Sequence, residues 1–312
     1  MHCTTGVAMT TYNGAEYLLR QLDSIRLQRC MPDRVVICDD GSGDESCALV
    51  AAYIEKHGLQ QSWRLVRNQQ NLGYTRNFFQ AIDMLDTDLI FFSDQDDVWN
   101  PEKIARMRAV MEERPEICLL SCGYRFVDEN DAPIETLRYG KFGNTGALRK
   151  IGAGEIVREF NWPGMCMAVR RDFWCEKCRM HENSGVPFDR LFALMAEKEG
   201  EFWQLDWIGA DHRIHSNNAG GEKVAAKDYL SRANKLRELN GACAWHEAAL
   251  KLPVSEVARR AEEGYLALIQ LRREALKRRN PLLSMRAFLC QPVRANLRGV
   301  LADICMILFS KS

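Results

Sequence analysis

Short apolar runs alternate with segments of helical spacing through the first half of the chain. The predicted strands are residues 6–10, 34–38, 63–66 and 89–92, and the predicted helices between them are residues 16–27, 45–57 and 74–85. Strands that alternate with helices of this length form a mostly parallel, doubly wound sheet. Right-handed crossovers then bring the carboxyl ends of these strands to one edge of the sheet. We therefore expect an α/β fold of Rossmann-like type.

The rest of the chain is less regular and ends in helices. We expect one or two strands within 117–127, a loop at 129–155, a strand at 162–169, a helix at 187–199 and a strand at 202–207. From residue 228 onward the pattern is helical, with breaks near Pro253, Pro281 and Pro292. The sequence thus predicts an α/β domain at residues 1–225 and a basic, helical C-terminal region at residues 226–312.

Composition and cysteine usage indicate the compartment. Twelve cysteines are scattered through predicted strands and helices rather than set in a compact framework, which favours reduced thiols in the cytoplasm. The first predicted strand begins almost at the N-terminus and leaves no room for a signal peptide. No apolar run approaches the roughly 20 residues needed to span a bilayer. We expect a cytoplasmic protein that is soluble or bound peripherally to a membrane.

The run Leu89–Trp99 ends a predicted strand in a cluster of carboxylates. Asp94, Asp96 and Asp97 lie within four positions. Such groups must stay hydrated, be paired or bind a cation, and their oxygens suit hard ions such as Mg²⁺ or Mn²⁺. A cap on the helix that starts near Pro101 accounts for Asp97 but not for the other two. Because the carboxyl edge of an open α/β sheet lines its binding crevice, the cluster predicts a metal or nucleotide site.

Three other polar clusters follow predicted strands and are expected at the same edge. Residues 10–14 and 39–44 are each typical of a turn with a helix cap, which accounts for much of both clusters. Asp40 has no such structural duty, and its carboxylate could accept the imide N–H of a uracil or thymine ring. Residues 71–77 open a helix and offer backbone amides together with Arg76 to a phosphate.

Together these motifs resemble the nucleotide-sugar-binding domain of family 2 glycosyltransferases with the GT-A fold. They read Thr11-Tyr12-Asn13-Gly14, Asp39-Asp40-Gly41-Ser42, Asn71-Leu72-Gly73 and Ser93-Asp94-Gln95-Asp96-Asp97-Val98-Trp99. The last motif is most similar to the rhamnosyltransferase-like branch, which commonly builds bacterial surface polysaccharides. The resemblance covers roughly residues 6–218 and implies an inverting, metal-dependent glycosyltransferase.

The resemblance also implies roles on the donor side of the site. Thr11, Tyr12 and Asp40 would hold a pyrimidine base, and Asp94 would meet the ribose. Asp96 would ligate Mn²⁺ or Mg²⁺ at the diphosphate. Further candidate contacts with the nucleotide sugar are Asn13, Asn71, Gly73, Arg76 and Arg213. Further candidate metal ligands are Asp97 and His215, although a lone histidine is as often an ordinary core or surface group.

On the acceptor side, Asp189 is the candidate general base. The family carries an Asp at the start of the corresponding helix, usually after a His, and here Phe188 stands in place of that His. Asp189 would take a proton from the acceptor hydroxyl. The alternative is that it only caps the helix. The acceptor-side wall of the family is matched by Trp162–Met167, with Pro163 where a Thr is common.

The expected donor is a nucleoside diphosphate sugar, with dTDP-rhamnose as the leading case by resemblance. The expected acceptor is a glycan or lipid-linked glycan in cell-surface polysaccharide biosynthesis. One alternative is a sugar-phosphate nucleotidyltransferase, which needs a Gly-rich signature with Arg and Lys after the first strand. Another is a non-catalytic nucleotide-sugar-binding protein, in which Asp189 would be only a cap. A dinucleotide dehydrogenase is disfavoured because no Gly-x-Gly-x-x-Gly follows the first strand.

The C-terminal segment 270–312 is basic and amphipathic. Although the formal net charge of the chain is zero, residues 231–312 carry fifteen Lys and Arg against seven Asp and Glu. Such a segment can lie on an anionic membrane surface. The alternative is a helix packed on the catalytic domain or on a partner subunit, with its charges solvated. No nucleic-acid partner is expected, because the segment lacks a recognised aromatic and basic module.

Overall fold

The computed structural model describes residues 2–134, 142–158, 161–215, 231–290 and 297–309. The chain forms two compact units. The sheet unit comprises residues 1–152, 161–182 and 187–213, and the helical unit comprises residues 153–160, 183–186 and 214–312. The predicted boundary between residues 225 and 226 lies outside the described residues and stays a prediction.

The strands of the sheet unit form one sheet in the order β3-β2-β1-β4-β8-β6-β9-β5, with β7 paired to β9. The strands are β1 (Thr5–Thr11), β2 (Arg34–Asp39), β3 (Trp63–Arg67), β4 (Leu89–Ser93), β5 (Val98–Trp99), β6 (Leu119–Val127), β7 (Leu148–Lys150), β8 (Met167–Arg170) and β9 (Phe202–Arg213). The helices are α1 (Ala15–Arg26), α2 (Ser46–Lys56), α3 (Tyr74–Asp83), α4 (Lys103–Glu113), α6 (Arg171–Phe173) and α7 (Phe188–Lys198). Shorter helical turns are η1 (Gly164–Cys166), η2 (Trp174–Cys178) and η3 (Arg179–His181).

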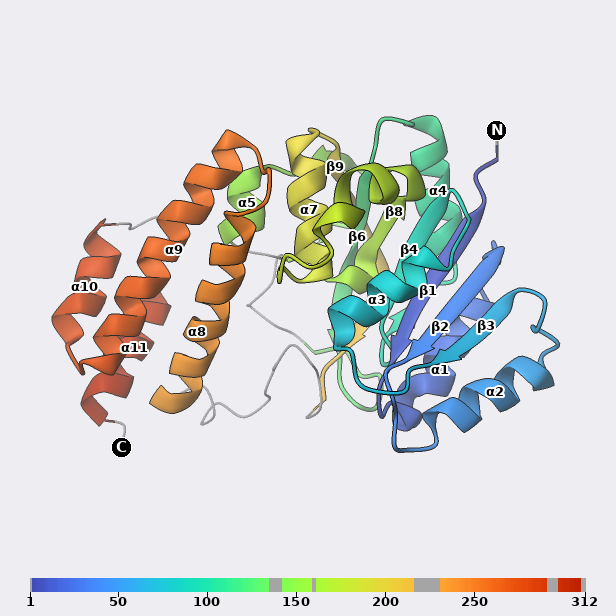
Figure 1. Cartoon of the computed structure of the whole chain (residues 1–312), viewed down its shortest axis with the longest axis horizontal. Coiled ribbons are helices and arrows are strands. Elements are labelled where there is room, and N and C mark those ends of the chain that lie inside the picture. The colour runs from blue at the N-terminus through green and yellow to red at the C-terminus, as the bar shows by residue number, and fades with distance from the viewer. Residues whose placement is uncertain (1, 135–141, 159–160, 216–230, 291–296, 310–312) are drawn as a thin grey trace. The chain divides into compact units, whose positions relative to one another are not determined.

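The first four strands in chain order, β1 to β4, run parallel to one another. β1 pairs in parallel with both β2 and β4, and β2 pairs in parallel with β3 (Figure 1). β1 and β4 are buried along their whole lengths, which suits their largely apolar sequences. The register sets Thr11 opposite Asp39 and Met9 opposite Ser93, so the chain leaves β1, β2 and β4 at the same edge of the sheet. The predicted doubly wound, mostly parallel sheet is confirmed.

Amphipathic helices cover this sheet. Leu18, Leu22 and Ile25 of α1 are buried and lie at the three-and-four spacing that places them on one helical face. Helix α3 buries Phe78 and Ile82 and packs across β1 and β2 (Figure 1). The apolar periodicity in the sequence therefore predicts both the helices and the faces that they bury.

The other half of the sheet departs from the predicted pattern. β9 continues to Arg213, beyond the predicted end at residue 207, and pairs in parallel with β6. β7 lies within the segment 129–155 that was expected to be a loop. The strand predicted at 162–169 begins only at Met167, because Pro163 has no N–H for a ladder and the next three residues form the turn η1. β8 is antiparallel to both of its neighbours, β4 and β6.

The described part of the helical unit consists of α5 (Ala153–Arg158), α8 (Arg232–Ala249), α9 (Glu256–Lys277), α10 (Pro281–Cys290) and α11 (Leu297–Phe309). Pro253 separates α8 from α9, and Pro281 is the first residue of α10, a position at which the missing N–H costs no hydrogen bond. Two of the predicted helix breaks are thus confirmed. The third, at Pro292, lies outside the described residues.

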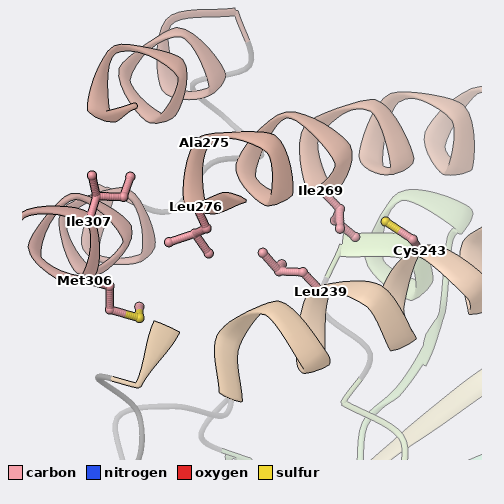
Figure 2. Close-up of a cluster of buried hydrophobic side chains, with 7 residues drawn as sticks. All are labelled: Leu239, Cys243, Ile269, Ala275, Leu276, Met306 and Ile307. Atoms are coloured by element: carbon pink, nitrogen blue, oxygen red, sulfur yellow. The ribbon is translucent and has the colours of Figure 1, made fainter. Parts of the chain in front are cut away.

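Apolar side chains from α8, α9 and α11 form the core of the helical unit. Its buried members are Leu239, Cys243, Ile269, Ala275, Leu276, Met306 and Ile307 (Figure 2). Arg272 of α9 also donates two hydrogen bonds to the buried Asp303 of α11, at 2.7 and 3.0 Å. Within the described ranges, no helix combines the length and the apolar character needed to cross a membrane.

Candidate active site

Gln95 joins the loop after β1 to the acidic loop after β4. Its Oε1 accepts hydrogen bonds from the Thr11 hydroxyl at 2.8 Å and from the Tyr12 backbone N–H at 2.7 Å, and its Nε2 donates to the Tyr12 carbonyl at 3.2 Å. A Cβ atom on Gly14 would lie 2.1 Å from Gln95 Oε1, so this contact requires glycine at position 14. The Tyr12 side chain stays about half exposed, which leaves its ring accessible to a base.

Asn13 joins the same loop to the turn after β2. Its backbone N–H donates to Ser42 Oγ and its Oδ1 accepts from the Gly43 N–H, both at 2.9 Å. These bonds hold Asn13 at a φ of 48°, in the left-handed region that Asn tolerates better than most residues. Asp39 completes the turn by accepting from the Ser42 N–H at 2.9 Å. The loops after β1 and β2 therefore form one connected surface.

Asp40 holds the segment that leads into α3. It is buried, and its Oδ1 accepts from the Leu72 N–H at 2.8 Å and from Asn68 Nδ2 at 3.0 Å. Its Oδ2 accepts from the Gly73 N–H at 2.9 Å. The expectation that Asp40 has no structural duty is therefore wrong. Because each carboxylate oxygen can accept more than one hydrogen bond, its predicted contact with a pyrimidine ring stays a prediction.

Asn71 and Gly73 shape the start of α3. Asn71 Oδ1 accepts from the Gly73 N–H at 3.1 Å, and Gly73 adopts a φ of 83°, which favours glycine. Because α3 begins at Tyr74, the exposed Arg76 lies in its first turn. A helix N-terminus and a cationic side chain thus occur together, as the predicted phosphate contact requires.

The loop after β4 brings three carboxylates into a poorly hydrated setting. Asp96 and Asp97 are buried, and Asp94 is half-buried. Burial raises the pKa of Asp94 well above its usual value, and the carboxylates of Asp97, Asp96 and, more weakly, Asp189 raise it further. Because charges act on one another appreciably only over short distances, Asp97, Asp96 and Asp189 each lie within electrostatic range of Asp94.

Asp97 is held from the end of β9. Its Oδ1 lies 2.8 Å from His212 Nδ1 and accepts from the Arg213 backbone N–H at 3.3 Å. Burial raises the pKa of Asp97, and the nearby imidazole of His212 opposes that rise. Helix α4 begins only at Lys103, so the alternative that Asp97 caps it is wrong. The second oxygen of Asp97, Oδ2, is buried and has no hydrogen-bond partner among the described residues.

Arg213 is a buried link between the acidic loop and the turn after β6. Its Nε donates to the Asp96 carbonyl at 2.9 Å, and its Nη1 donates to the Asp128 carbonyl at 2.9 Å. Its Nη2 donates to Asp131 Oδ1, and the guanidinium lies 4.9 Å from the ring centre of Tyr17. These contacts indicate a structural role for Arg213. Its predicted contact with the diphosphate stays a prediction.

Arg213→Met should lower the free energy of unfolding by about 3 kcal/mol, because the backbone carbonyls and the Asp131 carboxylate would lose a buried donor. Arg125→Met is the matched control. Arg125 pairs with Asp211 through two hydrogen bonds but is about half exposed, so its loss should cost less than about 1 kcal/mol. Urea unfolding measures both variants. Equal losses would contradict the structural role of Arg213.

Phe188 packs among aromatic rings at the start of α7. Its ring stacks on Phe78 with 4.1 Å between centroids, and it meets Phe92 edge-on at 5.2 Å. A Cβ atom on Gly164 would lie 2.2 Å from the Phe188 ring, so the packing also depends on glycine at position 164. Phe188, at the position where the resemblance implies a His, therefore extends the apolar core up to the next residue, Asp189.

Asp189 lies in the first turn of α7, and its Oδ1 accepts from the Arg190 N–H at 2.7 Å. Burial raises the pKa of Asp189 to about 6. The pKa of the Tyr74 phenol is raised as well, by burial and then by the charges of Asp189 and Asp94. A carboxylate of this kind can accept a proton near neutral pH. The local hydrogen bond to Arg190 is compatible with that chemistry.

The carboxylates at this edge suit a divalent cation that is shared with a phosphate. Across the described ranges, no three His, Cys, Asp or Glu side chains are grouped closely enough to hold a metal by themselves. Mg²⁺ at nucleotide sites usually takes one or two carboxylates and completes its shell with phosphate oxygens and water. Asp96 and the unpartnered Oδ2 of Asp97 fit that mode. His215 belongs to the helical unit, and its role as a ligand stays a prediction.

Two residues with contacts at this site, Gln95 and His212, were not predicted as functional. Gln95 stands inside the acidic motif, but its partner Thr11 is 84 positions earlier. The only signal in the sequence is an amide placed between two carboxylates just after a strand. Strand alternation predicts that His212 and Arg213 lie on opposite faces, yet both contact the acidic loop: His212 through its ring, and Arg213 through its backbone N–H and its Nε.

Comparisons with known proteins identify the family of the chain. The sequence model of glycosyl transferase family 2 matches residues 6–175, just over half of the chain. Among curated proteins, the amylovoran biosynthesis glycosyltransferase AmsB of Erwinia amylovora is 27% identical over 156 residues, which are 49% of this chain and 49% of AmsB. The chain spans about half or less of the length of the curated relatives that it matches.

Solved structures share the fold. TarS 1–349 of S. aureus, in complex with UDP-GlcNAc, aligns with a TM-score of 0.60 at 15% identity, over 97% of this chain and 81% of that one. The mannosyltransferase PcManGT of Pyrobaculum calidifontis, in complex with GDP-Man and Mn²⁺, aligns with a TM-score of 0.59 at 17% identity, over 100% of this chain and 82% of that one. At these identities the likeness shows the fold alone, and it confirms the predicted GT-A fold.

Proposed function

The chain belongs to glycosyl transferase family 2, and we propose that it transfers a sugar from a nucleoside diphosphate sugar to an acceptor hydroxyl, with inversion at the anomeric carbon. The observation that carries the proposal is the closeness of the start of α7 to the end of β4: the Phe188 ring packs on Phe92 with 5.2 Å between centroids, and the Asp189 carboxylate acts electrostatically on Asp94. Asp94, Asp96 and Asp97 follow β4, whereas Asp189 comes from α7. Groups suited to holding a donor thus lie near a group suited to activating an acceptor.

On the donor side, Thr11, Tyr12 and Asp40 would hold the base, and Asp94 would meet the ribose. Asp96, with Asp97 as a second ligand, would hold a divalent cation, which supplies positive charge against the departing nucleoside diphosphate. The links made by Gln95 and Arg213 would keep the acidic loop in place while the donor binds. The acidic loop after β4 would thus be held in place where negative charge develops on the departing diphosphate.

On the acceptor side, Asp189 would take the proton of the acceptor hydroxyl. The hydroxyl oxygen forms the new bond to the anomeric carbon as the bond to the diphosphate breaks, through a transition state with oxocarbenium character. The nucleoside diphosphate leaves with that bonding pair, and the proton stays on Asp189 until it passes to solvent. No covalent glycosyl-enzyme is required.

The raised pKa of Asp189 predicts the acid side of the pH profile. Below about pH 6 the carboxyl is protonated and cannot accept the acceptor's proton, and above that pH it is ionised. We therefore expect kcat/KM to fall about tenfold for each pH unit below this value and to level off above it. Initial rates across pH, at a saturating Mn²⁺ concentration, measure this fall in kcat/KM on the acid side. A rate that stays flat from pH 7 to pH 5 would exclude Asp189 as the base.

For the substrates, we propose a thymidine or uridine diphosphate sugar, with dTDP-rhamnose as the leading donor by the form of the motif Asp94–Trp99. TarS and PcManGT were solved with UDP-GlcNAc and GDP-Man, which supports the broader class of nucleotide-sugar donors. We propose a glycan or lipid-linked glycan as the acceptor. The name of AmsB, an amylovoran biosynthesis glycosyltransferase, supports a role in surface polysaccharide assembly.

A panel of nucleotide sugars tests the donor proposal through thermal stabilisation of the protein. The correct donor should raise the melting temperature in the presence of Mn²⁺ or Mg²⁺, and a ligand at 100 times its Kd stabilises by about 2.7 kcal/mol. Chelation of the metal should remove most of the effect. Stabilisation that is the same for every base, with or without metal, would contradict both the base contacts and the metal site.

We also propose that the reaction takes place in the reducing cytoplasm. The cysteines that the structure describes are all free, and several of them, such as Cys38, Cys122 and Cys178, are buried in the core. Free, scattered cysteines of this kind are typical of proteins that fold where thiols stay reduced. Localisation of the tagged full chain by cell fractionation tests the proposal.

A further inference from the structure

Helix α10 carries an exposed apolar stripe. Leu282, Met285 and Leu289 are spaced by three and four residues and therefore lie on one helical face. Their side chains are 69%, 49% and 73% exposed. On the neighbouring helix α11, Leu301 and Leu308 are 51% and 59% exposed. Large apolar side chains this exposed, on two helices that pack on each other, are typical of a surface that binds a partner or a membrane.

These side chains do not hold the helical unit together. Helix α11 packs inward through Met306 and Ile307 (Figure 2) and is tied to α9 by the hydrogen bonds between Arg272 and Asp303. Helix α10 packs through Ala287, which is buried against α9. Each helix thus packs its inward face against the rest of the helical unit, and the exposed Leu and Met side chains are not part of that packing.

Basic side chains flank the stripe on α10. Lys277, Arg278 and Arg279 at the end of α9 and Arg286 on α10 are exposed. From residue 277 to residue 290 the sequence contains no Asp or Glu. Glu274 contacts Arg278 at 3.0 Å and Lys277 at 3.9 Å, so part of the charge at the end of α9 is balanced within that helix. The surface as a whole remains both apolar and positive.

We propose that the end of α9, the exposed face of α10 and the exposed leucines of α11 form a docking surface for an anionic lipid bilayer. The leucines would enter the headgroup region, and the basic side chains would meet the anionic headgroups. A protein partner would need an apolar groove lined with acids, whereas an anionic bilayer offers both features everywhere. Given the proposed function, docking would hold the enzyme where lipid-linked acceptors reside.

Flotation of the full chain with vesicles tests the proposal. The vesicles contain phosphatidylglycerol and phosphatidylcholine in equal parts, and vesicles of phosphatidylcholine alone serve as the neutral comparison. We expect the chain to float with the anionic vesicles and to be released by high salt. Arg279→Glu with Arg286→Glu should weaken binding by more than about 25-fold, since each basic side chain at an anionic surface contributes about a factor of five and the new carboxylates are repelled. Leu282→Ser with Leu289→Ser should weaken it at least about tenfold.

Matched variants in the sheet unit control for charge and for apolar surface. Lys56→Glu with Arg64→Glu makes the same change of charge at exposed positions, and Leu27→Ser with Met31→Ser removes exposed apolar side chains. Both should float as the parent chain does. Even if a variant misfolds, flotation of the wild-type chain with anionic and with neutral vesicles tests the proposal. Absence of flotation, equal binding to neutral vesicles, or a stripe occupied by a second copy of the chain in sedimentation would each overturn it.

Discussion

Asp189→Asn should lower kcat by about 10²- to 10⁴-fold and leave the Kd of the donor nearly unchanged. The amide has the size of the carboxylate, and its oxygen can still accept the Arg190 N–H, but it cannot take up the acceptor's proton. Initial rates with the donor found in the nucleotide-sugar panel, together with its Kd, separate the two effects. A loss of donor affinity without a loss of turnover would move Asp189 from the reaction to the binding site.

The control for this substitution is Asp172→Asn. Asp172 lies in the first turn of α6, and its Oδ1 accepts from the Phe173 N–H at 2.6 Å, the same bond to the next residue that Asp189 makes. Because Asp172 is exposed and has no part in the proposed site, its substitution should leave kcat unchanged. If the two variants behave alike, Asp189 serves only its helix.

Asp96→Ala should abolish the metal-dependent stabilisation by the donor and lower turnover by about 10³-fold or more. A cation at a departing diphosphate supplies several kcal/mol of charge stabilisation, and each 1.4 kcal/mol corresponds to about a factor of ten in rate. The melting temperature in the presence of donor, measured over a Mn²⁺ titration, reports the metal site directly. Turnover is then compared at the highest Mn²⁺ concentration that the protein tolerates.

Asp211→Ala provides the comparison for Asp96→Ala. Asp211 lies on β9 and pairs with the half-exposed Arg125, so the substitution removes a carboxylate from a neighbouring strand without entering the acidic loop. It should keep the full response to Mn²⁺. An Asp96→Ala variant that is still stabilised by donor and metal together would show that another group holds the cation.

Local patterns predict the first half of the fold well, because each helix or strand there has a clear hydrophobic pattern within its own short segment. The buried run Leu89–Ser93 and the spacing of Leu18, Leu22 and Ile25 depend on nothing beyond their own neighbours. The strand predicted at 162–169 begins only at Met167, because Pro163 has no N–H for a ladder and residues 164–166 form the turn η1. Local sequence patterns therefore predict a helix or strand correctly where its structure depends mainly on its own residues.

The arrangement of the site depends instead on contacts between distant segments. The sequence does not reveal the structural role of Asp40, because the N–H groups that donate to its carboxylate, those of Leu72 and Gly73, lie in another loop. The packing of Phe188 on Phe78 and against Gly164 likewise joins three separate segments. Only resemblance to a family could suggest Asp189 as a base, since its raised pKa arises from burial that no local pattern reveals.

Under the proposed function, the double contact made by Gln95 limits how the donor could change over evolution. The same side chain braces Thr11 and Tyr12, beside which the nucleobase would stack, and belongs to the loop that would grip the pyrophosphate. A mutation that reshapes the first loop to admit a purine would also disturb the second. Lineages that switched between pyrimidine and purine donors should therefore have replaced residues 14 and 95 together, a covariation that homologous sequences can reveal.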